Sequence, residues 1–368
     1  MKRRTAVVAG IAGAAAIAGA APLVGQTAQK GPVPDVASQA LHVQEHDAMT
    51  FSPADPAALA AARKDAFAPP VAPAPQDHTS MENTRPRVRH YWIKAVNRRW
   101  DVAPNGQDVI EGRQIAPEQR TMDAVVYRAY TPGWRKPLPN RAASGDNDGV
   151  PGPLIEARVG DRVFVHFKNE DRVHKLAHSM HFHAFTYAPG SDGAFIPQIS
   201  GPGGNVKVGR SFTYKFTAGP DSAGTWPYHD HSSTMHESIP YGLYGVLRIY
   251  GRNERPPDRR FVVAFSEHLG FNTINGRAFI GNTPTFTAKV GETVEWNVIA
   301  LGELFHTFHP HGHRWRTAAG ESIDNREIGP GSSFTVRWKE DAPGTWYYHC
   351  HVESHQMNGM IGLYKVTR

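Results

Sequence analysis

Histidines gather in four short segments of the chain. Thirteen of the 20 His lie in residues 177–183, 228–236, 306–313 and 348–355, and each segment contains a His-X-His pair. One such pair is a weak signal, because paired His also occur as core residues or as zinc ligands. Eight imidazoles exceed what one zinc ion can use, whereas three copper ions would use them as two, three and three. The pattern predicts a three-copper cluster bound by His181, His183, His229, His231, His309, His311, His349 and His351.

The single Cys of the chain lies inside one of these pairs. On a β-strand, side chains alternate between the two faces, so His349 and His351 point one way and Cys350 the other. The same alternation puts His306 on the Cys350 side if its segment is extended. A thiolate, two imidazoles and a distant thioether are the ligands of a blue-copper site. The predicted ligands are Cys350, His306, His355 and Met360, with Met357 as a competing axial ligand and a buried structural thiol as the alternative for Cys350.

Two copies of one β-domain are expected to position these ligands. Short runs of Val, Ile, Phe, Tyr and Trp alternate with polar residues and end at Gly, Pro, Asn or Asp, which predicts an all-β sandwich or barrel. The segment Thr-Trp-X-Tyr-His-X-His begins at Thr225 and recurs at Thr345, 120 residues later. This repeat predicts two homologous domains, residues 86–253 and 254–368.

The residues before the first domain differ in composition. Residues 1–20 contain Lys2, Arg3 and Arg4 ahead of an apolar run, which predicts an export signal of the twin-arginine type, with an ordinary secretory signal as the alternative. Residues 21–85 are rich in Ala and Pro and are predicted to be a flexible linker with one short helix near residues 56–64. We expect a periplasmic or extracellular protein.

The charge balance argues against nucleic acid as a partner. The formal net charge is +6 at pH 7, and three of the cations lie in the predicted export signal, which leaves +3 for the rest of the chain. A charge this small gives little electrostatic attraction for a polyanion. We expect neither a nucleic-acid nor a membrane partner.

Together these motifs resemble those of the multicopper oxidases. The length and the two repeats are similar to the two-domain bacterial members called small laccases, over about residues 88–368. The resemblance implies two cupredoxin-like Greek-key β-sandwich domains, with the type 1 copper in the second. The segments that carry it are the two His pairs of the first half, His306-X-X-His309-X-His311 and His349-Cys350-His351-X-X-X-His355-X-X-X-X-Met360.

The resemblance also implies a role for each ligand and four copper ions per chain. The Cys350 set would hold the type 1 copper, and His181 and His309 the type 2 copper. The type 3 pair would be held by His183, His229, His231, His311, His349 and His351.

Three further residues resemble groups that lie near the copper cluster in this family. Asp192 and Asp324 resemble carboxylates behind the ligands that could deliver protons, and Tyr187 resembles a tyrosine beside the cluster. Each of the three could instead be an ordinary loop or surface residue.

The first half departs from the type 1 pattern. Asp230, Met235 and Pro240 stand where the second half has Cys, His and Met. His178 is then either a remnant of a lost type 1 site or a residue that lies behind the ligands.

The implied activity is that of a laccase: one-electron oxidation of phenols or aromatic amines, coupled to the four-electron reduction of dioxygen to water. A cuprous oxidase of this family usually carries a Met-rich insert, and eight scattered Met provide none. A ferroxidase needs carboxylates beside His355, for which Glu353 and Glu321 are candidates, so it is the runner-up.

Two other classes fit the motifs less well. Copper nitrite reductases share the fold but keep the type 1 site in the first domain, and a copper-storing or electron-carrying cupredoxin would leave eight paired His without a role. Because no spacer domain separates the two halves, the shared cluster is expected to form between neighbouring chains, which must then close into a ring or continue as a filament. The family resemblance implies a ring of three chains, a homotrimer.

Overall fold

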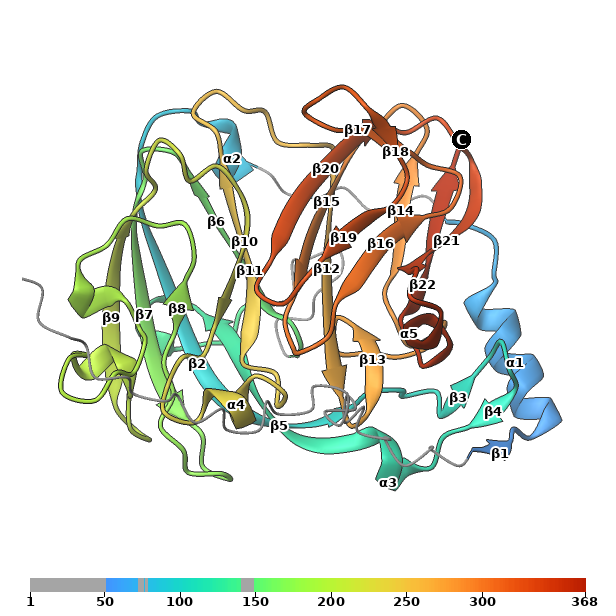
Figure 1. Ribbon diagram of the computed structural model, residues 1–368, viewed down its shortest axis with the longest axis horizontal. Helices are drawn as coiled ribbons and strands as arrows, with labels where there is room; N and C mark the ends of the chain where they lie inside the picture. Colours follow the sequence, from blue (N-terminus) through green and yellow to red (C-terminus); the bar gives the residue numbers. More distant parts are fainter. Residues whose placement is uncertain (1–50, 72–75, 77–78, 140–148) are drawn as a thin grey trace, which may run out of the picture. The chain divides into compact units, whose positions relative to one another are not determined.

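The first half of the chain folds into two four-stranded sheets packed face to face (Figure 1). This computed structural model describes residues 51–71, 76, 79–139 and 149–368. One sheet has the strand order β5 (Thr121–Tyr130), β2 (Val88–Asp101), β7 (Arg162–Glu170) and β9 (Ser211–Thr217). The other has the order β6 (Gly152–Arg158), β11 (Tyr244–Tyr250), β10 (Gly224–His229) and β8 (His181–Phe182).

The second half repeats this architecture. One sheet has the order β13 (Phe271–Ile274), β12 (Arg259–His268), β15 (Thr293–Ala300) and β20 (Ser333–Lys339). The other has the order β14 (Thr285–Lys289), β22 (Ile361–Thr367), β21 (Gly344–Cys350), β16 (His306–Pro310) and β19 (Arg326–Ile328). The prediction of an all-β chain with two sandwiches is therefore confirmed.

Alternating apolar residues build both cores. Along β7, Val163, Val165 and Phe167 are fully buried, and the residues between them are not. The second core is centred on Trp296, whose ring centroid lies 4.8 Å from that of Phe261. Aromatic rings bury large areas and stabilise such cores strongly, so both sandwiches are rigid supports for the residues at their surfaces.

The strand register brings the His pairs together in the same way in each half. In the first sandwich β8 and β10 are antiparallel, and His181 lies opposite His229. In the second, β16 and β21 are antiparallel, and His309 lies opposite His349. Residues that are distant in sequence thus become cross-strand neighbours.

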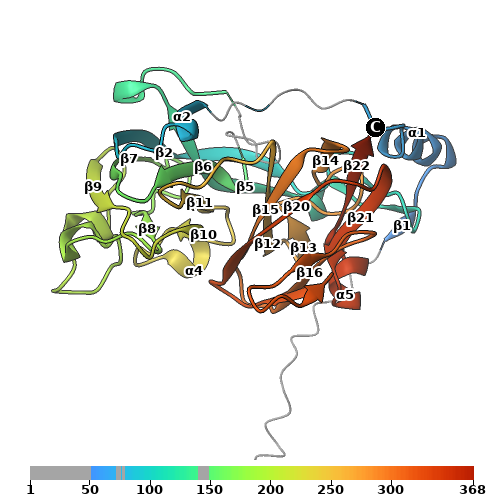
Figure 2. The ribbon, with the colours of Figure 1, turned by 90° about the horizontal axis from the view of Figure 1, so that it is seen from above.

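The two sandwiches contact each other directly within the unit Met49–Arg368, side by side in two views (Figures 1 and 2). Thr225 Oγ1 on β10 donates a hydrogen bond to Asn297 Oδ1 on β15 at 2.5 Å. Arg248 on β11 forms a buried ion pair with Glu295 on β15 at 2.9 Å. A buried charge is tolerated only when it is paired, so this contact fixes both partners in place.

The short helix predicted near residues 56–64 is confirmed, and the described residues around it contact the second sandwich, which the flexible-linker prediction did not include. Helix α1 (Pro56–Ala66) begins after Asp55, whose carboxylate accepts hydrogen bonds from two amides of the first turn. Lys365 on β22 donates hydrogen bonds to the carbonyls of Ala66 and Ala68, at 2.9 and 2.8 Å. Composition predicts disorder here because it cannot reveal a partner 299 residues away.

Short elements complete the described part of the chain. No helix in it is long and apolar enough to cross a membrane. The predicted export signal, residues 1–20, lies outside the described residues. The short elements are β1 (Ser52–Pro53), α2 (Thr79–Glu82), β3 (Gln107–Asp108), β4 (Arg113–Gln114), α3 (Pro117–Arg120), η1 (Pro132–Trp134), η2 (Pro189–Ser191), η3 (Pro202–Gly204), α4 (Met235–Ser238), β17 (Trp315–Arg316), β18 (Ser322–Ile323) and α5 (Glu353–Met357).

Candidate metal centres

Cys350, His306 and His355 form a compact cluster in the second sandwich, which we call the thiolate site. The Cys350 Sγ lies 3.9 Å from His306 Nδ1 and 3.7 Å from His355 Nδ1. All three ligand atoms lie within 4.8 Å of one another. A metal ion about 2.3 Å from a thiolate and about 2.0 Å from each imidazole nitrogen fits between atoms at these separations. The donor set and the spacing both suit copper.

Met360, the predicted axial ligand, adjoins the thiolate site through its main chain. Its amide donates to the carbonyl of His355 at 3.0 Å, and its carbonyl accepts from the Cys350 amide at 3.1 Å. The Met360 side chain is fully buried, whereas Met357 is 47% exposed. Met360 thus adjoins two ligands through backbone pairing, and the competing candidate faces solvent.

The surroundings of Cys350 favour its ionised form. Burial alone raises the pKa of the thiol, but hydrogen bonds from His306, His355 and the Thr307 amide lower the pKa to about 6. The thiolate is the form that binds metal. The site is therefore prepared for a metal cation at neutral pH.

A second cluster lies in the first sandwich and contains His181, His183 and His229. The Nε2 atoms of His183 and His229 lie 3.3 Å apart. Two imidazole nitrogens that share one metal ion at about 2.0 Å lie roughly 3 to 3.5 Å apart. The ring of His231 is 5.3 Å from that of His181, so all four predicted ligands of this half are brought together.

A third cluster repeats this arrangement in the second sandwich with His309, His311 and His349. The Nε2 atoms of His311 and His349 lie 3.0 Å apart. The ring of His351 is 5.3 Å from that of His309. We call the clusters of the first and second sandwich half-site 1 and half-site 2.

Main-chain carbonyls orient the rings in both half-sites. His181 Nδ1 and His309 Nδ1 each donate at 2.7 Å, to the carbonyls of Asp192 and Asp324. When one ring nitrogen is held in this way, the other is left as the metal ligand. His229 and His349 are held by the carbonyls of Asp230 and Cys350, at 2.9 and 2.8 Å.

Burial keeps three imidazoles of the half-sites neutral at physiological pH. Burial is the largest cause that lowers the pKa of His183, His229 and His349 to about 4 in each case. Neutral imidazole is the form that binds a metal ion, so burial keeps the half-sites ready for metal.

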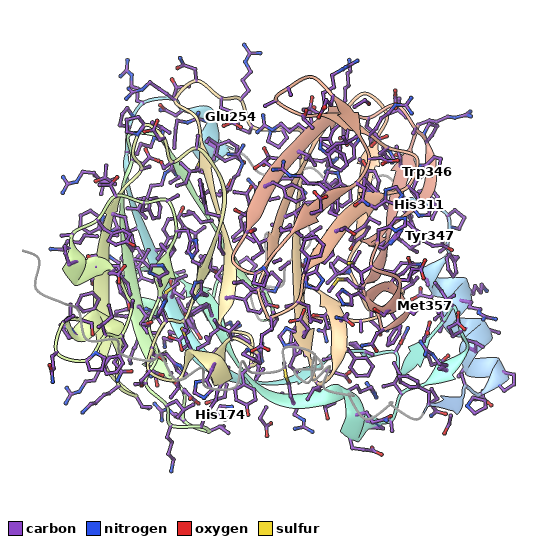
Figure 3. All side chains as sticks on the ribbon, viewed as in Figure 1. His174, Glu254, His311, Trp346, Tyr347 and Met357 are labelled. Atoms are coloured by element: carbon purple, nitrogen blue, oxygen red, sulfur yellow. The ribbon has the colours of Figure 1, made fainter. Side chains whose placement is uncertain are left out.

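The two half-sites are separate within one chain. Across the described ranges, no group of potential ligands combines His from both sandwiches. Figure 3 shows His311 at the outer edge of the second sandwich, on the side away from the first. One chain therefore presents two incomplete halves rather than one closed eight-His cluster.

The three predicted residues behind the ligands are placed differently from one another. Asp192 Oδ1 lies 3.5 Å from His181 Nδ1. Burial and a hydrogen bond with Asp192 raise the pKa of Tyr187 to about 12. Asp324 contacts His309 through its carbonyl, and within the described part of the chain its carboxylate makes no hydrogen bond or ion pair. Tyr187 and Asp192 thus adjoin half-site 1, and only the main chain of Asp324 adjoins half-site 2.

The position in the first sandwich that matches the thiolate site is occupied by a His between two carboxylates, without a thiolate. His178 Nε2 lies 3.0 Å from Asp171 Oδ2 and His178 Nδ1 lies 3.2 Å from Asp230 Oδ2, with all three side chains fully buried. Burial opposes protonation, but the two carboxylates raise the pKa of His178 to about 9. The Met235 side chain is 38% exposed. His178 is therefore a buried cation between two anions.

Two acidic residues that the sequence motifs do not predict contact His178 and the thiolate site. Asp171 pairs with His178, as described above. Glu267 Oε1 on β12 lies 3.0 Å from His306 Nε2, an oblique ion-pair contact at the thiolate site. Neither belongs to a motif. Glu267 is 39 residues before His306, and only the fold brings them together.

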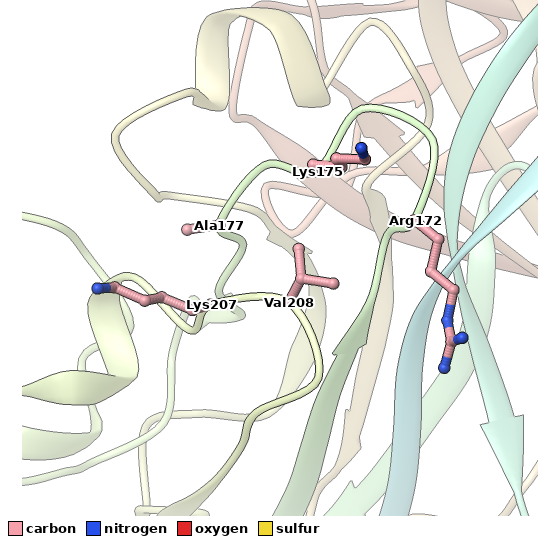
Figure 4. A pocket seen from close by; sticks show the side chains of 5 residues that line it. All are labelled: Arg172, Lys175, Ala177, Lys207 and Val208. Carbon is pink, nitrogen blue, oxygen red and sulfur yellow. The ribbon is translucent and has the colours of Figure 1, made fainter.

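An open pocket of the first sandwich contains none of the candidate ligands. It is lined by Arg172, Lys175, Ala177, Lys207 and Val208 (Figure 4). The three cationic side chains point in different directions in Figure 4, and Arg172 pairs with Glu170 at 2.8 Å. The pocket therefore does not form a converging anion site.

The fold and the thiolate site define a copper protein of the cupredoxin class. Two family models, both described as multicopper oxidase, match residues 130–254 and 252–368. The chain belongs to the multicopper oxidase family. The predicted family and the cupredoxin-like fold are thereby confirmed.

Known proteins of several activities are similar to the chain. It is 34% identical over 247 residues to a probable nitrite reductase-hydroxylamine oxidoreductase fusion protein of Kuenenia stuttgartiensis. The aligned region covers 60% of this chain and 28% of that protein. The chain is 26% identical over 350 residues to ferroxidase HEPHL1 of Mus musculus, covering 76% of this chain and 29% of that protein. The chain thus spans less than a third of these relatives. A solved multicopper oxidase is similar with a TM-score of 0.59 at 25% identity, covering 76% of this chain and 89% of that one.

Proposed function

We propose that the chain is a laccase-type oxidase that oxidises phenols or aromatic amines one electron at a time and reduces dioxygen to water. The observation that carries the proposal is the position of Cys350 on β21, between His349 and His351. One strand thereby supplies ligands to the thiolate site and to half-site 2. Copper at these positions, four ions per chain as one type 1, one type 2 and two type 3, would supply the one-electron redox chemistry.

The residues of the thiolate site differ in their exposure to solvent. His355 is half-buried, while Cys350 and His306 are fully buried. The His355 ring is therefore the ligand through which a reductant in solution approaches most closely. Cys350 connects this site to His349 and His351 through the covalent backbone, which is the shortest bonded route to half-site 2.

Two residues beside half-site 1 are suited to proton delivery. The Asp192 carboxylate lies beside His181, and it hydrogen-bonds with Tyr187. Asp192 is 31% exposed and can exchange protons with solvent. We propose that Asp192 carries protons toward dioxygen and that Tyr187 holds the Asp192 carboxylate in position. Asp324 has no such contact among the described residues, so its proposed role is to orient His309 through its carbonyl.

The separate half-sites support a proposed homotrimer. A complete eight-His cluster needs half-site 1 to face half-site 2, and His311 lies on the side of its sandwich away from the first domain. A head-to-tail contact between chains must close into a ring or continue as a filament. A closed ring of three chains would complete three clusters and leave no half-site unpaired.

The proposed activity is tested by dioxygen uptake with copper-loaded protein and a phenol. The expected result is uptake that depends on both copper and the phenol. Protein that binds copper at the thiolate site but consumes no dioxygen would instead be an electron carrier or a copper store, and the proposal would fail.

Ferroxidase activity is the second candidate, because a carboxylate touches a ligand of the thiolate site. That carboxylate is Glu267, beside His306. Glu353 is exposed on α5 with His355. Glu321 is exposed just before β18, and its amide donates a hydrogen bond to Thr317 Oγ1. Comparing kcat/KM for ferrous iron and for a phenol on the same preparation decides between the two. A higher value for iron that falls in Glu267→Ala would favour the ferroxidase.

We also propose that the protein is exported and acts in the periplasm or outside the cell. The twin-arginine start and the apolar run of residues 1–20 support this proposal. Replacing Arg3 and Arg4 with Lys should retain the protein in the cytoplasm. Unchanged export of that variant would contradict a twin-arginine route.

A further inference from the structure

We infer that Glu267 is a positioning residue of the thiolate site that lowers the reduction potential of a copper ion bound there. The site would then favour electron donors that are easily oxidised. The inference rests on the proposed function, because it concerns the copper ion proposed for that site. The preferred electron donors are thereby those of low reduction potential, a preference that neither the motifs nor the relatives specify.

The two nitrogens of the His306 ring face different partners. Nδ1 points toward Cys350 Sγ at 3.9 Å, and Nε2 lies 3.0 Å from Glu267 Oε1. His306 begins β16, and Glu267 is the penultimate residue of β12. The imidazole therefore bridges the thiolate and the carboxylate.

The contact is enclosed. His306 Nε2 and Glu267 Oε1 are both buried, and within the described residues neither forms a regular hydrogen bond with another group. The rings of Phe265 and His355 lie 5.4 and 5.1 Å from the His306 ring and restrict its rotation. The Glu267 side chain is 24% exposed, but the two atoms of this contact are buried, so solvent screens their interaction less than it would at the surface.

The backbone of the preceding loop holds the carboxylate in place. Glu267 Oε2 accepts a hydrogen bond from the Glu303 amide at 3.1 Å. Gly302 has a φ of +137°, and a Cβ at this position would collide with the Glu267 carboxylate. Only glycine combines this conformation with so close an approach. The loop thus forms a cradle that fixes Glu267 against the ligand ring.

This geometry has a direct electronic consequence. A carboxylate on the outer nitrogen of a ligand imidazole raises the basicity of the ligating nitrogen. A more basic ligand and a nearby negative charge both stabilise the oxidised ion, which carries one more positive charge than the reduced ion. The reduction potential is therefore lower with the carboxylate than without it.

The test is the midpoint potential of copper-loaded Glu267→Gln, measured by redox titration of the blue absorption band. Gln keeps the size and the acceptor oxygen but removes the charge. We expect the blue band to remain and the reduction equilibrium to shift toward the reduced form by about tenfold, which is about 59 mV upward for one electron. Glu303→Gln is the matched control, because it removes an exposed carboxylate and keeps the amide that holds Glu267. It should shift the equilibrium by less than twofold.

A blue Glu267→Gln protein with an unchanged potential would overturn the inference, and so would an equal shift in Glu303→Gln. If Glu267→Gln does not fold, Glu267→Asp provides the same test, because it keeps the charge but withdraws it from His306. Its potential should lie above that of the wild type, and an unchanged value would also overturn the inference. Wild-type protein that shows no blue band with copper would instead refute the proposed function.

Discussion

The carbonyl of Cys350 accepts a hydrogen bond from His349 Nδ1 at 2.8 Å. The residue that offers a thiolate to one site therefore orients an imidazole of the other. The first sandwich has the same relationship between Asp230 and His229, at 2.9 Å, but a carboxylate replaces the thiol. The two halves thus share the geometry of a half-site, and only the second half adds a thiolate site.

Replacing the thiolate tests the separation of the two sites. Cys350→Ser should abolish the intense visible band, because that band needs sulfur bound to copper, and should leave the near-ultraviolet shoulder of a coupled copper pair. The backbone carbonyl that holds His349 is unchanged in this variant. Absorption spectra of copper-loaded wild type and variant check the prediction, and a variant that stayed blue would refute the ligand assignment.

We expect half-site 1 to be required for dioxygen reduction but not for the visible absorption band. His231→Ala should keep the visible band and lower dioxygen reduction by more than the roughly 10–100-fold that loss of an outer hydrogen-bond partner costs. His236→Ala is a suitable control, because the His236 side chain is 74% exposed. Loss of the blue colour in folded His231→Ala protein would contradict the division between the sites.

The buried cation His178 predicts a pH-dependent stability. Its pKa is about 9 in the folded protein, against about 6.5 in an unfolded chain, so protonation favours the fold. The stabilisation, roughly 3 kcal/mol for a shift of this size, is fully present below pH 6.5 and is lost as the pH rises through 9. The free energy of unfolding in urea should fall over that range in the wild type. The fall should be absent in His178→Gln and retained in His236→Gln; identical slopes in all three proteins would exclude His178 as the cause.

Complementation between chains tests the proposed trimer. His181→Ala/His183→Ala and His349→Ala/His351→Ala should each be inactive, since each lacks one half-site. After dissociation and reassembly of a mixture, some interfaces combine an intact half from each variant, and part of the activity should return. An active copper-loaded species that sediments as a monomer would contradict the shared cluster.

Strand parity made the main ligands predictable from the sequence. Alternation alone separates Cys350 from its two neighbouring His, and the 120-residue repeat identifies the matching pair in the first half. Glu267 and Asp171 could not be found in this way, because their partners are set by which strands pack together. The short helix near residues 56–64 was predicted, but the packing of α1 through Lys365 required the folded chain.

The most direct test of the proposed oxidase is the ratio of donor oxidised to dioxygen consumed by the copper-loaded wild type. A phenol gives up one electron at a time, and reduction of dioxygen to two waters takes four. We expect four phenol oxidations per dioxygen with no hydrogen peroxide detected. A ratio of two with accumulation of peroxide, or no dioxygen uptake at all, would contradict it.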